Sequence, residues 1–170
     1  MPTISVSIIT KNAMPRLQET LESVKWADEI IVLDSGSSDN TVEVSRQYTD
    51  KVYETDWPGF GIQHQRALKK CSGDWILSVD SDEVVTEALK NEILKAIAEA
   101  PEGINGFAFP RLSYLCNRPI HHCGWRPDYI PRVFRRGFVT YSSDLVHERP
   151  LIKGTTEHLK NDLIHYSYDS

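Results

Sequence analysis

Two carboxylates, Asp80 and Asp82, directly follow the apolar segment 75–79. Alternation along an extended chain would put both on one side and Ser81 on the other. Like charges this close raise each other's pKa unless a cation or a hydrogen-bond network neutralises them. Hard cations such as Mg2+ or Mn2+ bind both carboxylate and phosphate oxygens. The spacing favours a metal-diphosphate site, and the alternative is a solvated loop that caps the next helix.

A second polar cluster follows Asp34, the acidic end of the apolar segment 29–34. The small-residue loop 35–41 comes next and leads into a helix that Asp39 or Asn40 can cap. Open α/β sheets bind ligands at the carboxyl ends of their strands, beside helix N-termini. We therefore expect this loop and the acidic pair to face one ligand.

The elements that would position these residues alternate along the first part of the chain. Apolar and β-branched runs predict strands, and apolar residues at helical spacing predict helices, over the ranges 4–10 (strand), 15–25 (helix), 29–34 (strand), 42–48 (helix), 51–54 (strand), 62–71 (helix), 75–79 (strand) and 86–100 (helix). We expect Ile62 on the inner face of its helix. The order predicts a doubly wound α/β sheet.

Beyond Gly103 the pattern changes to shorter strands, predicted at 106–110, 113–116 and within 132–141, with a turn at 136–137. Segment 117–127 is too irregular to predict regular structure. A last strand is predicted at 162–168. Either that strand completes the sheet or the chain has been cut short.

Composition limits the class of protein. A chain of 170 residues that is 40% hydrophobic can build one domain with a sizeable core. Its net charge of -5 argues against a general nucleic-acid binder. Three cysteines without a regular framework fit a reduced, cytoplasmic setting. The sequence shows no signal peptide and no membrane-spanning segment.

The order of motifs resembles family 2 glycosyltransferases with the GT-A fold. Within that family it is similar to the bacterial β-1,4-glucosyltransferases of lipopolysaccharide core biosynthesis. The resemblance covers nearly the whole chain and rests on segments 7–12, 31–41, 73–83, 131–136, 146–148 and 163–167. Such proteins usually continue into a helical C-terminal region, which this sequence lacks.

The resemblance implies a Rossmann-like three-layer α/β/α open sheet, mostly parallel, with a smaller mixed sheet on the acceptor side. It implies one GT-A domain over residues 1–170. Residues 1–103 would form the nucleotide-sugar-binding half, and residues 104–170 the acceptor-side half.

The resemblance also implies roles for single residues. Asp34 would contact the nucleotide base, Asp80 the ribose, and Asp82 a divalent metal, Mn2+ or Mg2+. His165 would complete the metal shell or touch a phosphate, and its alternative is a structural role. The further nucleotide-sugar-binding residues that we predict are Thr10, Asn12, Ser35, Arg66 and Arg132. Asp34 could instead only close a turn, and Asn12 could cap the first helix. Arg66 could pair with a surface acid, and Arg132 could be a solvated strand residue.

An inverting transferase needs a carboxylate that takes the proton of the acceptor hydroxyl. We favour Glu148 for this role, with Asp144 second and Asp128 also a candidate. Glu148 could equally form a surface ion pair with Arg149 or Arg132.

The irregular loop offers one further contact. The indole of Trp125 can stack on a sugar ring of the acceptor, or it can anchor the loop. A zinc site from Cys116, His121, His122 and Cys123 is disfavoured, because the spacing matches no usual ligand pattern.

We therefore predict a metal-dependent inverting transferase that moves a hexose, glucose above all, from a UDP-sugar to a saccharide of the lipopolysaccharide core or a related envelope glycan. The alternative is a nucleotide-sugar-binding module, inactive without a missing C-terminal segment or partner. The acceptor would be an oligosaccharide or lipid-linked, and nucleic acid is not expected as a partner. The protein would be cytoplasmic, and peripheral association with the inner face of the cytoplasmic membrane is an expectation of the resemblance alone.

Overall fold

A computed structural model describes residues 1–120, 128–143 and 148–168. Within them lie four helices, α1 (Leu17–Val24), α2 (Thr41–Arg46), α3 (Phe60–Lys70) and α4 (Glu87–Glu99). The strands of the first half are β1 (Ile4–Thr10), β2 (Glu29–Asp34), β3 (Val52–Glu54), β4 (Trp75–Ser78) and β5 (Glu83–Val85). Those of the second half are β6 (Ile104–Leu115), β7 (Arg118–Ile120), β8 (Tyr129–Arg135), β9 (Val139–Tyr141), β10 (Pro150–Ile152), β11 (Thr155–His158) and β12 (Leu163–Tyr168).

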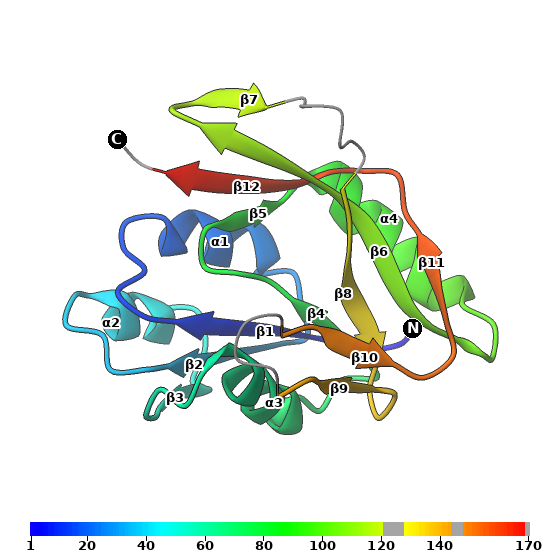
Figure 1. The fold of residues 1–170 in the computed structure, drawn as a ribbon, viewed down its shortest axis with the longest axis horizontal. Helices are drawn as coiled ribbons and strands as arrows, with labels where there is room; N and C mark the ends of the chain where they lie inside the picture. The colour runs from blue at the N-terminus through cyan, green and yellow to red at the C-terminus, as the bar shows by residue number, and fades with distance from the viewer. Residues whose placement is uncertain (121–127, 144–147, 169–170) are drawn as a thin grey trace.

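One large mixed sheet organises the described part of the chain (Figure 1). Its strand order is β3-β2-β1-β4-β8-β6-β12-β5, and both β7 and β11 pair with β6. The four strands β3, β2, β1 and β4 are parallel, whereas β8 is antiparallel to both of its neighbours. A separate small sheet consists of β9 and β10. This is the mixed α/β arrangement that the resemblance implies, with a small second sheet.

Helices cover both faces of the parallel strands, because these strands are apolar on both sides. Leu17 and Leu21 of α1 and Ile93 of α4 belong to the cluster that contains Val6 and Leu77. On the opposite face, Leu68 of α3 and Cys71, which follows the helix, pack against Ile31, Ile76 and Phe134. The three-layer α/β/α expectation is met in this half.

Two local predictions are wrong. Helix α3 begins at Phe60, earlier than expected, and Ile62 is 43% exposed. Gln63 takes the inner position, because its amide donates hydrogen bonds to Ser35 Oγ and Thr55 Oγ1, both at 2.9 Å. The two strands expected at 106–110 and 113–116 are one strand, β6.

The acidic pair also reaches its position differently from the alternation argument. Strand β4 ends at Ser78, and residues 80–83 form a turn closed by the Glu83 amide, which donates to the Asp80 carbonyl at 3.0 Å. Strand β5 follows at once and was not expected from the sequence. The turn reverses the chain towards β12, so Asp80 and Asp82 face one cavity without sharing an extended strand.

Candidate active site

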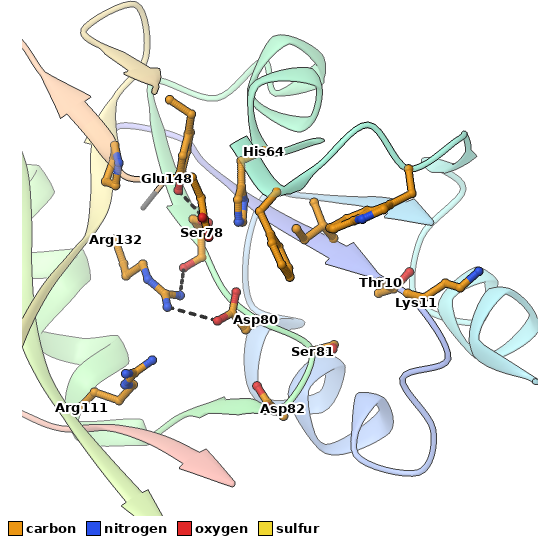
Figure 2. A pocket seen from close by; sticks show the side chains of 15 residues that line it. Thr10, Lys11, His64, Ser78, Asp80, Ser81, Asp82, Arg111, Arg132 and Glu148 are labelled. Atoms are coloured by element: carbon orange, nitrogen blue, oxygen red, sulfur yellow. Dashed lines mark hydrogen bonds and ion pairs between the residues drawn. The ribbon is translucent and has the colours of Figure 1, made fainter. Parts of the chain in front are cut away.

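A cavity of about 860 Å3 opens at the carboxyl ends of β1 and β4 (Figure 2). One wall comes from the acidic turn, and the others come from β1, from α3 and the loop before it, from β6 and β8, and from the small sheet. The residues that line it are Ile9, Thr10, Lys11, Trp57, Phe60, His64, Ser78, Asp80, Ser81, Asp82, Arg111, Arg132, Tyr141, Glu148 and Pro150. Predicted residues from both halves of the chain therefore meet in one site.

Asp80 is held by a buried ion-pair network. Arg132 on β8 donates from Nη1 to Glu83 Oε1 at 2.7 Å and from Nη2 to Asp80 Oδ2 at 3.2 Å. It also reaches the carbonyl of Ser78 at 3.2 Å. The side chain of Glu83 has no exposed area, and that of Arg132 is 14% exposed. Arg132 thus lines the cavity, as predicted, but its guanidinium is bonded to the chain's own carboxylates.

The network sets the protonation of its members. Burial alone would raise the pKa of Asp80, but the charge of Arg132 above all lowers it below its usual value. Burial raises the pKa of Glu83 against the opposing charge of Arg132. The pKa of Arg132 is raised by the two carboxylates despite burial. Asp80 is accordingly ionised at neutral pH.

Asp82 meets His165, the other residue predicted to bind metal. Nε2 of His165 lies 3.1 Å from Oδ2 of Asp82, and Nδ1 lies 3.3 Å from both Ser113 Oγ and Ser167 Oγ. The ring is therefore oriented by two hydroxyls on β6 and β12, as metal-ligating imidazoles usually are by a second partner.

This pair offers one carboxylate and one imidazole to a cation. Residues 1–120, 128–143 and 148–168 contain no group of three or more His, Cys, Asp or Glu side chains placed to hold a metal ion. The donor set fits a hard or borderline divalent cation that takes its remaining ligands from phosphate oxygens and water.

The predicted nucleotide pocket is a braced loop. Asp34 has no exposed area and accepts hydrogen bonds from Thr10 Oγ1 (2.7 Å), the Gly36 amide (3.0 Å), and the amide and hydroxyl of Ser37 (2.8 and 2.6 Å). Its carboxylate shapes the loop that follows β2. That Asp34 itself touches a base stays a prediction.

Asn12 and Lys11 hold the same loop from the end of β1. Asn12 adopts a positive φ of 48°, and its side-chain oxygen accepts from the Ser38 amide at 2.7 Å. Lys11 Nζ donates to the carbonyls of Ser35 and Gly36 at 3.1 and 2.9 Å. Asn12 therefore bridges two loops, and the alternative that it caps the first helix is wrong.

Arg66 lies outside the residues that line the cavity. Its Nη1 donates to Asp56 Oδ1 at 2.7 Å, in an ion pair whose aspartate side chain is 77% exposed. This is the surface pairing weighed as the alternative for Arg66. Ser35 is buried, and its hydroxyl accepts from Gln63 at 2.9 Å, so Ser35 supports the loop from below.

Glu148 lines the cavity on the side opposite to Asp82, with Asp80 between them (Figure 2). It sits beside Gly61 of α3, where an added Cβ would lie 3.4 Å from Glu148 Cβ and 2.3 Å from the Ser142 carbonyl oxygen. Asp144, Trp125, His121, His122 and Cys123 lie outside the described residues. Asp128 pairs with Arg111 at 3.8 Å and does not line the cavity.

Sequence reasoning missed several residues of the cavity. His64 points towards Asp80 (Figure 2) and stacks on Tyr141 with 4.5 Å between ring centroids. Burial lowers the pKa of His64 below its usual value despite the charge of Asp80, which favours the neutral imidazole. Trp57 and Phe60 are 46% and 53% exposed at the cavity. No local sequence pattern marks these residues as part of a ligand site. The one available signal is the pair of aromatic residues, Trp57 and Phe60, that flank Pro58 and Gly59.

Comparison with known proteins identifies relatives of this arrangement. The family described as "Glycosyl transferase family 2" matches residues 5–159. An uncharacterized glycosyltransferase of Rickettsia felis is 43% identical over 79% of this chain and 44% of its own length. The lipopolysaccharide core biosynthesis glycosyltransferase LpsC of Rhizobium meliloti is 31% identical over 96% of this chain and 63% of its own length. The chain thus spans about half the length of these curated relatives.

Two solved structures are similar to this chain in fold. TarS of S. aureus, in complex with UDP-GlcNAc, superposes with a TM-score of 0.70 over 99% of this chain and 59% of its own, at 15% identity, and shows the fold alone. Glucosyl-3-phosphoglycerate synthase of Mycobacterium tuberculosis, in complex with Mn2+, UDP-glucose and phosphoglyceric acid, reaches a TM-score of 0.54 at 27% identity. That match covers 64% of this chain and 43% of the synthase.

Proposed function

Because this chain belongs to glycosyltransferase family 2, we propose that it is an inverting, metal-dependent hexosyltransferase. The donor is a UDP-sugar, with glucose as the transferred hexose. The acceptor is a saccharide of the lipopolysaccharide core or a related cell-envelope glycan. The observation that carries the proposal is the cavity itself, which Asp80, Asp82 and Glu148 all line, together with the 3.1 Å contact of Asp82 with His165.

The donor assignment rests on two features. Glucosyl-3-phosphoglycerate synthase, 27% identical, was crystallised with UDP-glucose and Mn2+. In this chain, the loop braced by Asp34 stands at the carboxyl end of β2, next to Thr10, which lines the cavity. A uridine at that end would extend its ribose towards Asp80 and its diphosphate towards Asp82.

A divalent cation would be held by Asp82 and His165, and when bound it would act as a Lewis acid on the departing diphosphate. Three basic residues of the chain that line the cavity, Lys11, Arg111 and Arg132, already have partners within the protein and suit this need poorly. Arg132 is paired with Glu83 and Asp80, and Arg111 faces Glu83 and Asp128 at 3.8 Å. Lys11 donates to two loop carbonyls. We therefore expect Mn2+ or Mg2+ to be required.

Glu148 would take the proton from the acceptor hydroxyl as its oxygen attacks the anomeric carbon. The bond from that carbon to the diphosphate oxygen breaks, and UDP leaves with the electron pair. Inversion requires the base and the leaving group on opposite faces of the sugar, so the sugar would lie between Glu148 and the diphosphate beside Asp82. Asp144 remains the second candidate base.

The acceptor assignment follows the similarity to LpsC. Trp125 is the residue that we propose to stack on the acceptor saccharide. The reaction would take place in the cytoplasm, at the inner face of the membrane where a lipid-linked saccharide is available. Within the described residues, no helix is both long enough and apolar enough to cross a membrane.

The test is incubation of the protein with labelled UDP-glucose, other UDP-sugars and a core oligosaccharide, with Mn2+ or with chelator. We expect slow donor hydrolysis or transfer that is lost in Asp82→Ala and in chelator. Activity that survives both treatments would contradict the metal role.

A second candidate is a nucleotide-sugar-binding module that does no chemistry alone. It is favoured by the chain's span of 44% of the Rickettsia felis relative. In that case calorimetry would show UDP binding by this chain without turnover, and a longer polypeptide would restore transfer.

A further inference from the structure

Glu83 is a fully buried carboxylate at the end of the acidic turn 80–83. It begins β5, and its Oε1 accepts two hydrogen bonds of 2.7 Å, from the backbone amide of Asp80 and from Nη1 of Arg132. Its Oε2 lies 3.3 Å from Nη2 of the same guanidinium. A carboxylate is rarely buried without such partners, because desolvation of an unpaired charge is costly.

The same guanidinium reaches past Glu83 to the residue that faces the cavity. Nη2 of Arg132 donates to Asp80 Oδ2 at 3.2 Å, while 39% of the Asp80 side chain stays exposed. Asp80 is thus held at two points, its backbone amide by Glu83 and its carboxylate by Arg132. The network leaves one carboxylate oxygen, Oδ1, without a contact from Arg132.

The two clamping residues come from different parts of the sheet. Arg132 belongs to β8, which pairs with β4, and Glu83 belongs to β5, which pairs with β12. Arg111 of β6 adds a further charge 3.8 Å from Glu83 Oε2. Side chains of β8 and β6 therefore hold the turn between β4 and β5 in place.

We propose that Glu83 and Arg132 are positioning residues that hold Asp80 in the conformation that binds the donor nucleotide. The inference rests on the proposed function, since it takes Asp80 as a donor contact. It assigns Arg132 a different task from the nucleotide-sugar contact predicted from the sequence. Arg132 orients a carboxylate, and its planar guanidinium suits this task because its two Nη atoms bond Glu83 and Asp80 in a fixed relative orientation.

The test compares UDP affinity, measured by calorimetry at fixed Mn2+, in the wild-type chain and in Glu83→Gln. Gln retains the shape and one acceptor oxygen of Glu83, but it removes the negative charge that attracts Arg132 away from Asp80. Arg132 is then drawn towards Asp80, and the carboxylate moves. We expect UDP affinity to fall by about tenfold or more, because loss of a residue that orients a ligand-binding side chain usually has an effect of this size.

Glu29→Gln is the matched control. Glu29 is also a buried carboxylate, with an 8% exposed side chain, and it bonds Lys51, Ser5 and Ser72 away from the cavity. We expect Glu29→Gln to lower the melting temperature without changing UDP affinity. If both variants lower affinity in proportion to their loss of stability, Glu83 is merely structural and the proposal is wrong.

A double-mutant cycle tests whether Glu83 acts through Asp80. In an Asp80→Asn background, Glu83→Gln should cause little further loss of affinity. A full additive loss would overturn the proposal. Should Glu83→Gln fail to fold, Arg132→Lys enters the same cycle, since Lys keeps the charge but lacks the two Nη atoms with which Arg132 bonds Glu83 and Asp80. Wild-type affinity for UDP in Arg132→Lys would also overturn the proposal.

These outcomes separate the inference from the function on which it rests. A wild-type chain that fails to bind UDP contradicts the proposed function. A wild-type chain that binds UDP, loses it in Asp80→Asn and retains it in Glu83→Gln contradicts only the positioning role.

Discussion

Nε2 of His165 lies 3.1 Å from Oδ2 of Asp82, although the two residues are 83 positions apart in the chain. Strand β12 brings them together, because His165 pairs in register with Glu83 and the Tyr166 amide donates to the Asp82 carbonyl at 3.0 Å. The metal pair that we propose therefore exists only when the last described strand is in place.

Replacement of His165 should weaken metal binding. In His165→Ala the cation loses its nitrogen ligand, and we expect the affinity for Mn2+ in the presence of UDP to fall by about tenfold or more. Electron paramagnetic resonance of free Mn2+ measures this directly. His158→Ala is the control, since His158 lies on β11 and stacks on Tyr129, whereas His165 lies on β12 and contacts Asp82. Equal Mn2+ affinity in all three proteins would rule out His165 as a ligand.

Asp34→Asn should disturb the loop that follows β2. The amide group of Asn would replace an oxygen that accepts hydrogen bonds from buried donors, at a cost of about 1–3 kcal/mol. We expect both a lower melting temperature and weaker UDP binding. The exposed Asp50→Asn serves as control. Weaker UDP binding without any loss of stability would instead indicate that Asp34 contacts the base directly.

Gly61→Ala should impair turnover more than donor binding. A Cβ at this position would lie 2.3 Å from the Ser142 carbonyl oxygen, so the segment that leads to Glu148 has to shift. A shift of this kind near a general base costs roughly tenfold to a hundredfold in rate.

The measurement is the transfer rate beside calorimetric UDP affinity. Ile62→Ala, at the exposed neighbouring position, should leave both unchanged. Unaltered turnover in Gly61→Ala would argue against Glu148 as the base.

Acid stability should depend on Glu29. Burial would raise the pKa of Glu29, but hydrogen bonds from Lys51, Ser5 and Ser72 outweigh it and lower the pKa from 4.5 to about 2. Because the folded-state pKa is depressed, the stabilisation is present above pH 4.5 and is lost as the pH falls towards 2. Melting temperatures between pH 6 and pH 2 should therefore drop less steeply in Glu29→Gln than in the wild type, and parallel curves would contradict this.

Trp57 should report donor binding by its fluorescence. It is the exposed indole at the cavity, whereas Trp75 is 1% exposed in the core. We expect UDP-glucose with Mn2+ to change the tryptophan emission, and Trp57→Phe to remove the change. A signal that persists unchanged in Trp57→Phe would contradict donor binding beside Trp57.

The sequence alone was sufficient for the elements whose pattern is local. The continuous apolar run of β2 and the amphipathic stripe of α4 predict their own structure, because burial on both faces or on one stripe leaves its mark in neighbouring residues. The doubly wound order of the first hundred residues and the acidic ends at Asp34 and Asp80 follow from the same patterns. The short strands β5, β7, β10 and β11 were missed, because three or four residues carry too little periodicity.

Tertiary structure decided which of the candidate residues act together. Arg132 meets Glu83 across 49 residues, and His165 meets Asp82 across 83. Both contacts depend on where β8 and β12 enter the sheet. No local sequence pattern predicts the strand order β4-β8-β6-β12-β5. Arg66, by contrast, forms an ion pair with Asp56 and does not line the cavity. The sequence thus determined which acidic and basic side chains are available, and the non-local pairing of strands determined which carboxylate each basic side chain contacts.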